Sequence, residues 1–268
     1  MTSNGQSGLG LDFTCKGQRA LVTGAGSGIG RVIAEALLDA QAQVFVCDIS
    51  KEQLDECKRE LPGVHVIQAD VSNIAQVDNM FEEIQRVFGG LDILVNNAGV
   101  AGPVGFIEDN DPATWERNMD VNINSLFYCS RRAVPMLKAA GGGSIINTSS
   151  VAGRIGYPKR AGYSASKWAV VGLTKSLSME LGPYNIRVNS VLPGTVEGER
   201  HVRLYNERAK VQGMTFEEAE ELYTQQVSLR RFVTARDIAA AVVFLCAPVS
   251  RNISGQALGV CGDVQYMR

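Results

Sequence analysis

The chain has 268 residues, of which 45% are hydrophobic and 20% are charged, and its formal net charge is −2. These values are ordinary for one globular domain with a sizeable core, so we expect no second domain. No run of lysine and arginine is long enough to act as a nucleic-acid footprint or a membrane-surface patch, and no apolar stretch is long enough to span a bilayer. Nucleic-acid and membrane partners are therefore not expected.

The beginning of the chain predicts a flexible tail. Residues 1–12 are polar and glycine-rich, with neither the basic nor the apolar segment of a secretion signal. We expect a tail at 1–12, a single domain at 13–268 and a cytoplasmic location. The six cysteines are scattered and form no C-x-x-C pair, which is typical of small core residues in a reducing compartment. With two histidines in the chain and no clustered thiols, no metal site is expected.

Short runs rich in valine and isoleucine alternate with helical patterns along the chain. Most of these runs are continuously apolar and lack the alternation of apolar and polar residues that a half-exposed strand shows. This predicts strands buried on both faces. The expected strands are 19–23, 43–47, 65–69, 92–95, 144–148, 187–191 and 257–261, and the expected helices are 29–40, 51–60, 74–88, 112–140, 157–181 and 235–245. This order predicts an α/β fold with a doubly wound parallel sheet of about seven strands, helices on both faces, and a ligand at the carboxyl ends of the strands.

The first expected strand leads into a glycine-rich turn at the start of the first helix. Residues 23–30 read TGAGSGIG, with glycines at Gly24, Gly28 and Gly30 that allow a tight turn and a close approach of the backbone. The helix N-terminus then offers N–H groups to a pyrophosphate. The spacing differs from the commoner G-x-G-x-x-G, and a glycine turn without a nucleotide is the alternative.

An acidic residue, Asp48, ends the second expected strand, 18 residues after Gly30 (48 − 30). A carboxylate there can accept hydrogen bonds from both hydroxyls of an adenosine ribose and would repel a 2′-phosphate. No arginine stands at Ser27 or Ile49 to offset that repulsion. The pattern favours NAD over NADP, and a simple helix cap is the alternative for Asp48.

Polar or Gly/Pro clusters also follow the third to sixth strands, at 70–71, 96–99, 149–150 and 193–194. Because carboxyl ends of parallel strands meet at one edge, these clusters predict a single cleft. Farther along, Tyr163 and Lys167 stand one helical turn apart. A phenol titrates at about pH 10 in water, so it needs a nearby cation such as Lys167 to act as a base at neutral pH.

The longest connection runs from 197 to 229, and its pattern predicts two short amphipathic helices. Long ordered connections over a ligand-binding edge are often lids. A helical substrate lid is therefore expected at 197–229, with a solvated helical elaboration as the alternative.

Together these motifs make the chain similar to the short-chain dehydrogenase/reductase family over residues 16–262. The shared pieces are the TGxxxGIG turn, the NNAG motif at 96–99, the Tyr163 and Lys167 pair, and the Pro-Gly at 193–194. The resemblance implies a Rossmann-type fold, NAD as cofactor and a catalytic tetrad of Asn122, Ser150, Tyr163 and Lys167. Ser150 is preferred to Ser149 because it precedes Tyr163 by 13 residues (163 − 150), and Asn124 competes with Asn122.

The family pattern also implies a role for each residue. Ser150 would donate a hydrogen bond to the substrate oxygen and Tyr163 would remove the hydroxyl proton. Lys167 would lower the pKa of Tyr163 and hold the nicotinamide ribose, and Asn122 would hold a relay water. Asp70 is expected at the adenine, and a plain turn cap after the strand is the alternative. The expected cofactor contacts are Gly24, Ser27, Gly28, Ile29, Gly30, Asp48, Ile49, Asp70, Val71, Asn97, Ala98, Gly99, Tyr163, Lys167, Pro193, Gly194, Thr195 and Val196.

The expected activity is oxidation of a small or medium polyhydroxy secondary alcohol, with interconversion of alcohol and ketone. The alternatives are a ketone or 3-oxoacyl reductase, and a catalytically silent NAD-binding sensor or scaffold. Substrate contacts are expected from 100–103, 152–157 and the segment from 195 onward, where Glu197, Arg200, His201 and Arg203 are polar enough to bind hydroxyls or a carboxylate unless they are simply solvated. A homotetramer or homodimer is expected through the helix at 157–181, whose apolar residues are Trp168, Val171, Leu173 and Leu177. The alternative is that all of these residues pack on the sheet of their own chain.

Overall fold

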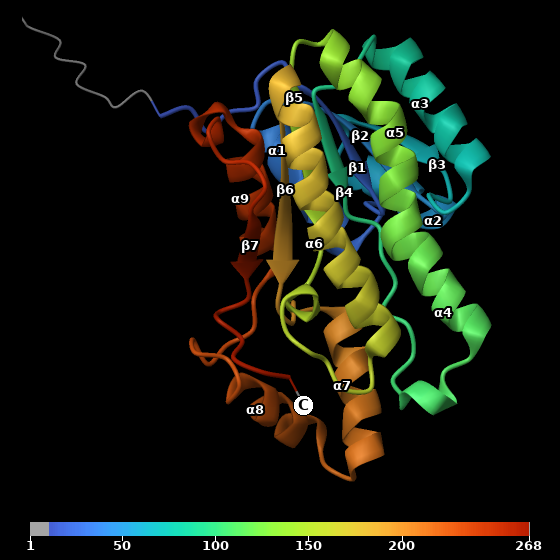
Figure 1. Ribbon diagram of the computed structural model, residues 1–268, viewed down its shortest axis with the longest axis vertical. Coiled ribbons are helices and arrows are strands. Elements are labelled where there is room, and N and C mark those ends of the chain that lie inside the picture. Colours follow the sequence, from blue (N-terminus) through green and yellow to red (C-terminus); the bar gives the residue numbers. More distant parts are fainter. Residues whose placement is uncertain (1–10, 268) are drawn as a thin grey trace, which may run out of the picture.

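The computed structural model describes residues 11–267, so most of the expected tail at 1–12 lies outside the described residues. Seven strands form one parallel sheet in the order β3-β2-β1-β4-β5-β6-β7 (Figure 1). The strands are β1 (Arg19–Thr23), β2 (Gln43–Asp48), β3 (Val64–Gln68), β4 (Ile93–Asn96), β5 (Gly143–Thr148), β6 (Ile186–Pro193) and β7 (Ala257–Val260). The expected doubly wound sheet is confirmed, with each strand within two residues of its predicted bounds.

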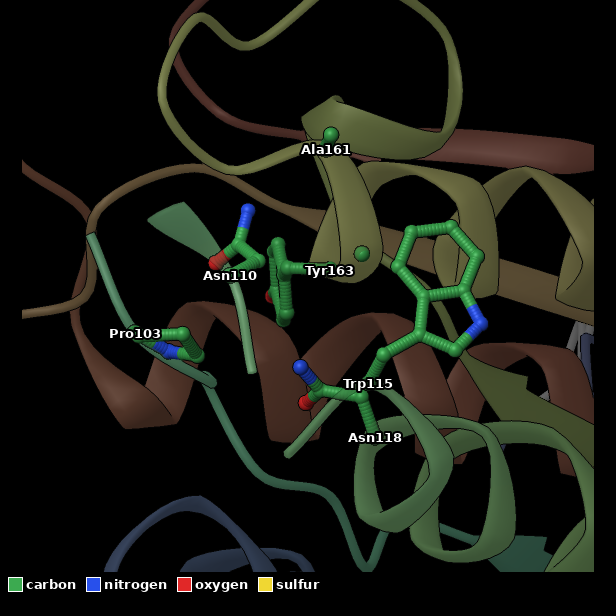
Figure 2. Close-up of a pocket in the computed structure, with 7 residues that line it drawn as sticks. Pro103, Asn110, Trp115, Asn118, Ala161 and Tyr163 are labelled. Atoms are coloured by element: carbon green, nitrogen blue, oxygen red, sulfur yellow. The ribbon is translucent and has the colours of Figure 1, made fainter. Parts of the chain in front are cut away.

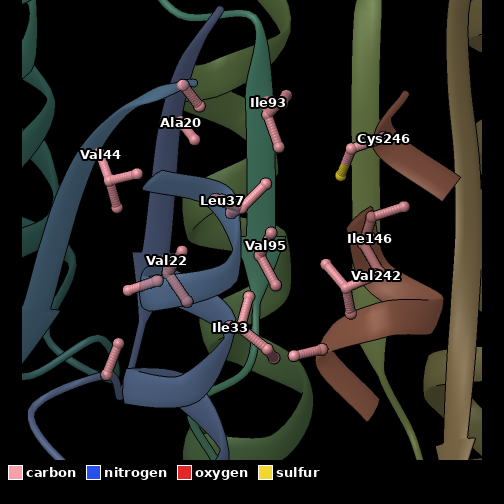
Figure 3. Packing of buried hydrophobic residues seen from close by; sticks show 14 of the residues in the cluster. Ala20, Val22, Ile33, Leu37, Val44, Ile93, Val95, Ile146, Val242 and Cys246 are labelled. Carbon is pink, nitrogen blue, oxygen red and sulfur yellow. The ribbon is translucent and has the colours of Figure 1, made fainter. Parts of the chain in front are cut away.

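Helices cover both faces of this sheet. They are α1 (Gly28–Asp39), α2 (Lys51–Glu60), α3 (Ile74–Phe88), α4 (Pro112–Met119), α5 (Ser125–Ala139), α6 (Ala161–Leu181), α7 (Glu199–Gln212), α8 (Phe216–Thr224) and α9 (Ala235–Cys246). Residues of α1, α2 and α9 form one apolar cluster with one face of the sheet, which Figure 3 shows around Val22, Ile33 and Val242. Residues of α3, α5 and α6 form a second cluster on the opposite face. Burial of each large apolar side chain stabilises the fold by about 1.5–3 kcal/mol.

The prediction of one continuous helix at 112–140 is wrong. It is divided into α4, a π-helical turn η2 (Asp120–Asn124) and α5. Single π turns inside α-helices often occur at functional sites. Here the turn contains Asn122, whose side chain is directed into the molecule and is fully buried. Helix propensity does not indicate this local change in winding.

The helix expected from 157 begins later, at Ala161. Residues before a proline are disfavoured in helical conformation, and Tyr157 precedes Pro158. Lys159 then has a φ of 59°, in the left-handed region, and Arg160 also lies outside the helical region. Residues 157–160 therefore form a loop that leads into α6.

The segment 197–229 forms the two expected short helices, α7 and α8, below the arrowheads of β6 and β7 in Figure 1. A third small apolar cluster joins them to the body of the protein and contains Tyr205, Tyr223 and Cys261. Tyr205 and Tyr223 contact edge to face at 5.8 Å between ring centroids. The two helices are thus packed on the carboxyl ends of the strands.

All six cysteines are buried and have free thiols. Burial raises the pKa of the Cys15 thiol to about 11 and that of Cys47 to about 12. They serve as small apolar residues in the core. Within residues 11–267, no helix is long and apolar enough to cross a membrane.

Candidate active site

The turn after β1 is held directly against the end of β4. The Thr23 hydroxyl accepts hydrogen bonds from the backbone N–H groups of Asn97 and Ala98, at 3.0 and 3.1 Å. The Asn97 amide in turn donates to the carbonyls of Thr23 and Gly24, both at 3.0 Å. Two of the motifs found in the sequence therefore form one rigid unit at the middle of the sheet edge.

The glycine turn has the geometry of an anion cradle. Gly24 and Gly28 have φ values of 60° and 56°, in the left-handed region that favours glycine. A Cβ at Gly24 would lie 2.7 Å from the Ala98 Cα, whereas a Cβ at Gly28 would meet no atom within 4 Å. The turn is therefore tight on one side and open on the other.

The first turn of α1 is left without a side-chain cap. Ser27 is its N-cap residue, but the Ser27 hydroxyl donates to the side-chain Oε1 of Gln53 at 3.1 Å and makes no capping bond. Uncapped N–H groups at a helix N-terminus attract anions. Beside the open space at Gly28, they fit the pyrophosphate of a dinucleotide.

Asp48 is fixed between this turn and α2. One carboxylate oxygen accepts a hydrogen bond from the Gly26 N–H and the other from the Ser50 N–H, both at 3.0 Å. Its side chain is 9% exposed, so the negative charge is held in place rather than solvated. Each carboxylate oxygen has a second lone pair, and these second lone pairs remain available to accept hydrogen bonds from ribose hydroxyls.

Asp70 caps the turn that follows β3, which is the alternative to an adenine contact. Its carboxylate accepts hydrogen bonds from the N–H and hydroxyl of Ser72, and Arg117 approaches it at 3.4 Å. Burial raises the pKa of Asp70, but the hydrogen bonds from Ser72 and the Arg117 cation outweigh it, so its pKa lies below the ordinary value. Val71 beside it is buried. Contact of Asp70 and Val71 with an adenine stays a prediction.

Lys167 and Tyr163 come together at the start of α6. The buried Lys167 ammonium lies 5.7 Å from the centre of the Tyr163 ring and donates a hydrogen bond to the Thr148 carbonyl at 3.0 Å. A Cβ at Gly99 would lie 3.4 Å from the Lys167 Nζ. The ammonium is therefore held at the junction of β4, β5 and α6.

The two serines after β5 have different partners. The Ser149 hydroxyl donates to the Lys167 carbonyl at 2.7 Å, which fixes β5 to α6. The Ser150 hydroxyl accepts a hydrogen bond from the Ala152 N–H at 3.2 Å. Ser150 thereby keeps its own proton for donation, which supports the preference for it over Ser149.

Asn122 is turned toward the site, and Asn124 is not. The Asn122 side chain accepts from the Val100 N–H at 2.8 Å and donates to the Val100 carbonyl at 2.9 Å and the Ser166 hydroxyl at 3.0 Å. The Asn124 amide instead donates to Asp120 at 2.8 Å on its own helix. Asn122 thus joins the loop after β4 to α6, within the candidate site.

A small pocket beside Tyr163 was missed by sequence reasoning (Figure 2). It is lined by Pro103, Asn110, Trp115, Asn118, Ala161, Gly162 and Tyr163. Pro103 belongs to the expected substrate segment, but α4 was not expected to contribute. The signal in the sequence is faint: Asn118 is an amide four residues before Asn122, on a helix whose other polar side chains are exposed or half-buried.

The loop after β6 is tied to the helices that follow it. The Thr195 N–H donates to the Tyr223 hydroxyl at 2.9 Å, and the Thr195 hydroxyl lies 3.3 Å from that of Tyr205. A Cβ at Gly194 would lie 3.0 Å from the Cys261 Cα, so glycine is needed there. The segment Pro193 to Val196 and the expected lid therefore form one packed unit.

The polar residues of that segment divide into two groups. Glu197, in the loop before α7, and Arg203, on α7, are exposed to solvent. His201 is 7% exposed, with its ring centroid 4.4 Å from that of Phe232 and its Nε2 2.9 Å from Glu220. The Arg200 side chain lies outside the described residues. His201 is thus packed against aromatic residues of the third cluster.

The chain is similar to known proteins over most of its length. The family model described as short chain dehydrogenase matches residues 18–209. A 3beta-hydroxysteroid dehydrogenase 2 from Eggerthella lenta is 36% identical over 92% of this chain and 94% of its own length. A probable galactose dehydrogenase, GalD, from Rhizobium meliloti is 35% identical over 91% and 93%. A variant of actinorhodin polyketide ketoreductase, solved with NADPH, superposes with a TM-score of 0.89 at 32% identity, over 93% of this chain and 97% of that one.

Proposed function

The chain belongs to the short-chain dehydrogenase family, and from this premise we propose that it is an NAD-dependent enzyme interconverting a secondary alcohol and a ketone, with Tyr163 as acid and base. The family acts on CH–OH and keto groups with nicotinamide cofactors. The observation that carries the proposal is the buried Lys167 ammonium 5.7 Å from the Tyr163 ring, since that cation favours the phenolate a base requires.

The four residues of the proposed tetrad have different tasks. Ser150 donates a hydrogen bond to the substrate oxygen and orients the carbinol. Tyr163 takes the hydroxyl proton in oxidation and returns it in reduction. Lys167 stabilises the phenolate and would hold the nicotinamide ribose. Asn122, hydrogen-bonded to Val100 and Ser166, would hold a relay water. When bound, the nicotinamide ring supplies the other half of the chemistry by accepting or donating a hydride.

We propose the cofactor contacts that the family pattern implies, with NAD as the cofactor. Gly24, Gly28 and the uncapped start of α1 support a pyrophosphate site. The fixed carboxylate of Asp48 supports NAD over NADP, since a 2′-phosphate at the same ribose would face a buried like charge. Ile49, at the next position, offers no compensating cation.

A polyhydroxy secondary alcohol is the proposed substrate, and oxidation is the proposed direction. The polar groups at the pocket beside Tyr163 support it, and one relative is named a probable galactose dehydrogenase. A second candidate, ketone or 3-oxoacyl reduction, is favoured by the likeness to a polyketide ketoreductase solved with NADPH. Asp48 weighs against that reading, because reductive metabolism usually draws on NADPH.

A panel of secondary alcohols, sugars and ketones, assayed with both NAD and NADP in both directions by nicotinamide absorbance, tests this function. We expect NADH formation with NAD and a sugar or polyol, and a weaker response with NADP. Faster turnover of 3-oxoacyl thioesters with NADPH would establish the reductase instead. Binding of NAD without turnover of any compound would favour a silent sensor.

We further propose that α6 takes part in a homotetramer or homodimer. Trp168 on α6 is 50% exposed and Phe127 on α5 is 54% exposed, so apolar rings remain at the surface of two helices that cover the same face of the sheet. Val171, Leu173 and Leu177 are half-buried. Light scattering on the purified chain is expected to give two or four times the mass of one chain, and Trp168→Glu is expected to lower it. A monomer at micromolar concentration would contradict the proposal.

A cytoplasmic location and a lid at 197–229 complete the proposal. The six free, buried thiols suit a reducing compartment. The bond between Thr195 and Tyr223 supports a lid that is linked mechanically to the nicotinamide end of the cofactor site.

A further inference from the structure

Arg160 is a buried arginine at the start of the helix that carries Tyr163. It is the N-cap residue of α6, it is 4% exposed, and its guanidinium donates a hydrogen bond to the Ala101 carbonyl at 2.7 Å. Burying a cation costs free energy, and the positive end of a helix dipole adds to that cost. Negative charge density near the guanidinium offsets both costs. The reaction roles given above make no use of this cation.

The guanidinium of Arg160 lies over the ring of Tyr163. Its Cζ is 5.1 Å from the centre of that ring and 5.4 Å from the centre of the Tyr157 ring. Lys167 approaches the Tyr163 ring as well, at 5.7 Å. Positions 160, 163 and 167 have the i, i+3, i+7 spacing of one helix face, which brings both cations to the same ring.

The pocket beside Tyr163 brings no charged side chain of its own to this ring among the described residues. Its walls from the segment between β4 and α4 are Pro103 and Asn110, and those from α4 are Trp115 and Asn118 (Figure 2). The titratable groups placed against the ring come from α6 and the loop before it, and they are Lys167, Arg160 and, across the guanidinium, Tyr157. Arg160 therefore acts on the reacting atoms through Tyr163.

A cation at the face of a tyrosine ring distinguishes the two protonation states of the phenol. The phenolate spreads its negative charge over the ring, so a guanidinium is attracted to it more strongly than to the neutral phenol. An arginine side chain is not deprotonated in proteins, so this charge is present at every working pH. The phenolate of Tyr163 then forms at a lower pH than it would without the cation.

We propose that Arg160 is a second cation for the phenolate of Tyr163 and is a positioning residue of the reaction alongside Lys167. The inference rests on the proposed function and adds a charge requirement to it. In oxidation Tyr163 must be a phenolate, so kcat/KM falls as the pH drops through its titration. In reduction Tyr163 must be protonated, so kcat/KM falls as the pH rises. Loss of the Arg160 charge moves both limbs to higher pH.

The experiment records kcat/KM against pH for wild type and Arg160→Gln, with NAD and the best polyol of the panel. Glutamine keeps an amide donor for the Ala101 carbonyl and removes the charge. We expect the acid limb of the profile to move up by about one pH unit. Below the limb kcat/KM should fall about tenfold, and above it kcat/KM should stay within about threefold of wild type. Loss of structure alone would lower kcat/KM equally at every pH.

Two further variants separate the charge of Arg160 from its packing. Arg160→Lys keeps the charge, and its acid limb is expected closer to that of wild type than to that of Arg160→Gln. The matched control is Lys159→Gln, which removes the neighbouring cation, 5.0 Å from the centre of a Phe106 ring that cannot ionise. Its profile should match wild type. If glutamine at 160 prevents folding, Arg160→Met keeps the apolar stem without the charge, and the same displacement is expected.

An acid limb that stays in place in the uncharged variant, or an equal loss at every pH, would overturn the role of Arg160 and leave it an anchor for the loop at Ala101. A displacement as large in Arg160→Lys would also overturn it, because the charge would then not be the cause. These results leave the proposed function standing as long as Tyr163→Phe is inactive, so the two failures are distinguishable.

Discussion

Replacing Tyr163 by phenylalanine is expected to abolish most turnover while cofactor binding persists. General acid–base catalysis by a positioned side chain contributes about 10² to 10⁴-fold, so we expect kcat with NAD and the best polyol to fall by that factor. Phenylalanine keeps the ring that packs 5.7 Å from Lys167 and lines the pocket, and it removes the group that moves the proton. Steady-state absorbance assays measure the loss.

Cofactor binding should survive because most of its expected contacts come from the ends of strands and not from α6, which carries Tyr163. The glycine turn follows β1 and Asp48 ends β2, so neither depends on the Tyr163 hydroxyl. Fluorescence titration with NAD is expected to give a dissociation constant within about threefold of wild type, below the tenfold change that about 1.4 kcal/mol would produce.

The matched control is Tyr184→Phe, which removes the hydroxyl of an exposed tyrosine stacked under Lys138, beyond the far end of α6. Turnover of this control should match wild type. If Tyr163→Phe retained a rate within tenfold of wild type, Tyr163 would not be the acid and base, and another proton acceptor would have to be sought.

The part of this site that could be predicted from the sequence follows from parallel strands. Residues at the carboxyl ends of such strands must meet at one edge, so Asp48, Asn97 and Ser150 could be placed together without knowledge of loop conformations. The strand register aligns the ends of β4 and β5. Asn96 lies opposite Asn147, and their side chains are hydrogen-bonded at 2.9 Å.

The part that could not be predicted depends on local departures from regular structure. The π turn at η2 directs Asn122 toward Val100, and a heptad or 3.6-residue pattern carries no sign of it. The amide of Asn118 was hidden for a related reason. Its Oδ1 is buried without a hydrogen-bond partner among the described residues, and this is visible only after the loop at 100–105 is packed against the loop before α6.

The second prediction of large effect concerns cofactor choice at Asp48. Asp48→Ala removes a buried carboxylate 3.0 Å from the Gly26 and Ser50 N–H groups. Juxtaposed like charges cost several kcal/mol, so relief of that repulsion should raise the NADP to NAD ratio of kcat/KM by about 10² to 10³-fold. Part of the change comes from weaker use of NAD, because the ribose hydroxyls lose their acceptor. Initial rates with each cofactor, at saturating alcohol, give the ratio.

A separate effect on stability identifies the structural share of Asp48. With its carboxylate gone, the two N–H groups lose their partner, and we expect the free energy of unfolding to fall by about 1–3 kcal/mol in denaturant titrations. The control is Asp55→Ala on α2, where the lost carboxylate is exposed and paired with Lys51, and neither cofactor ratio nor stability should move appreciably. The decisive measurement is the cofactor preference of the wild-type enzyme. If wild type already prefers NADP, the charge of Asp48 does not determine which cofactor binds. The two N–H bonds would then be its whole role, and the variant would lose stability without changing its ratio.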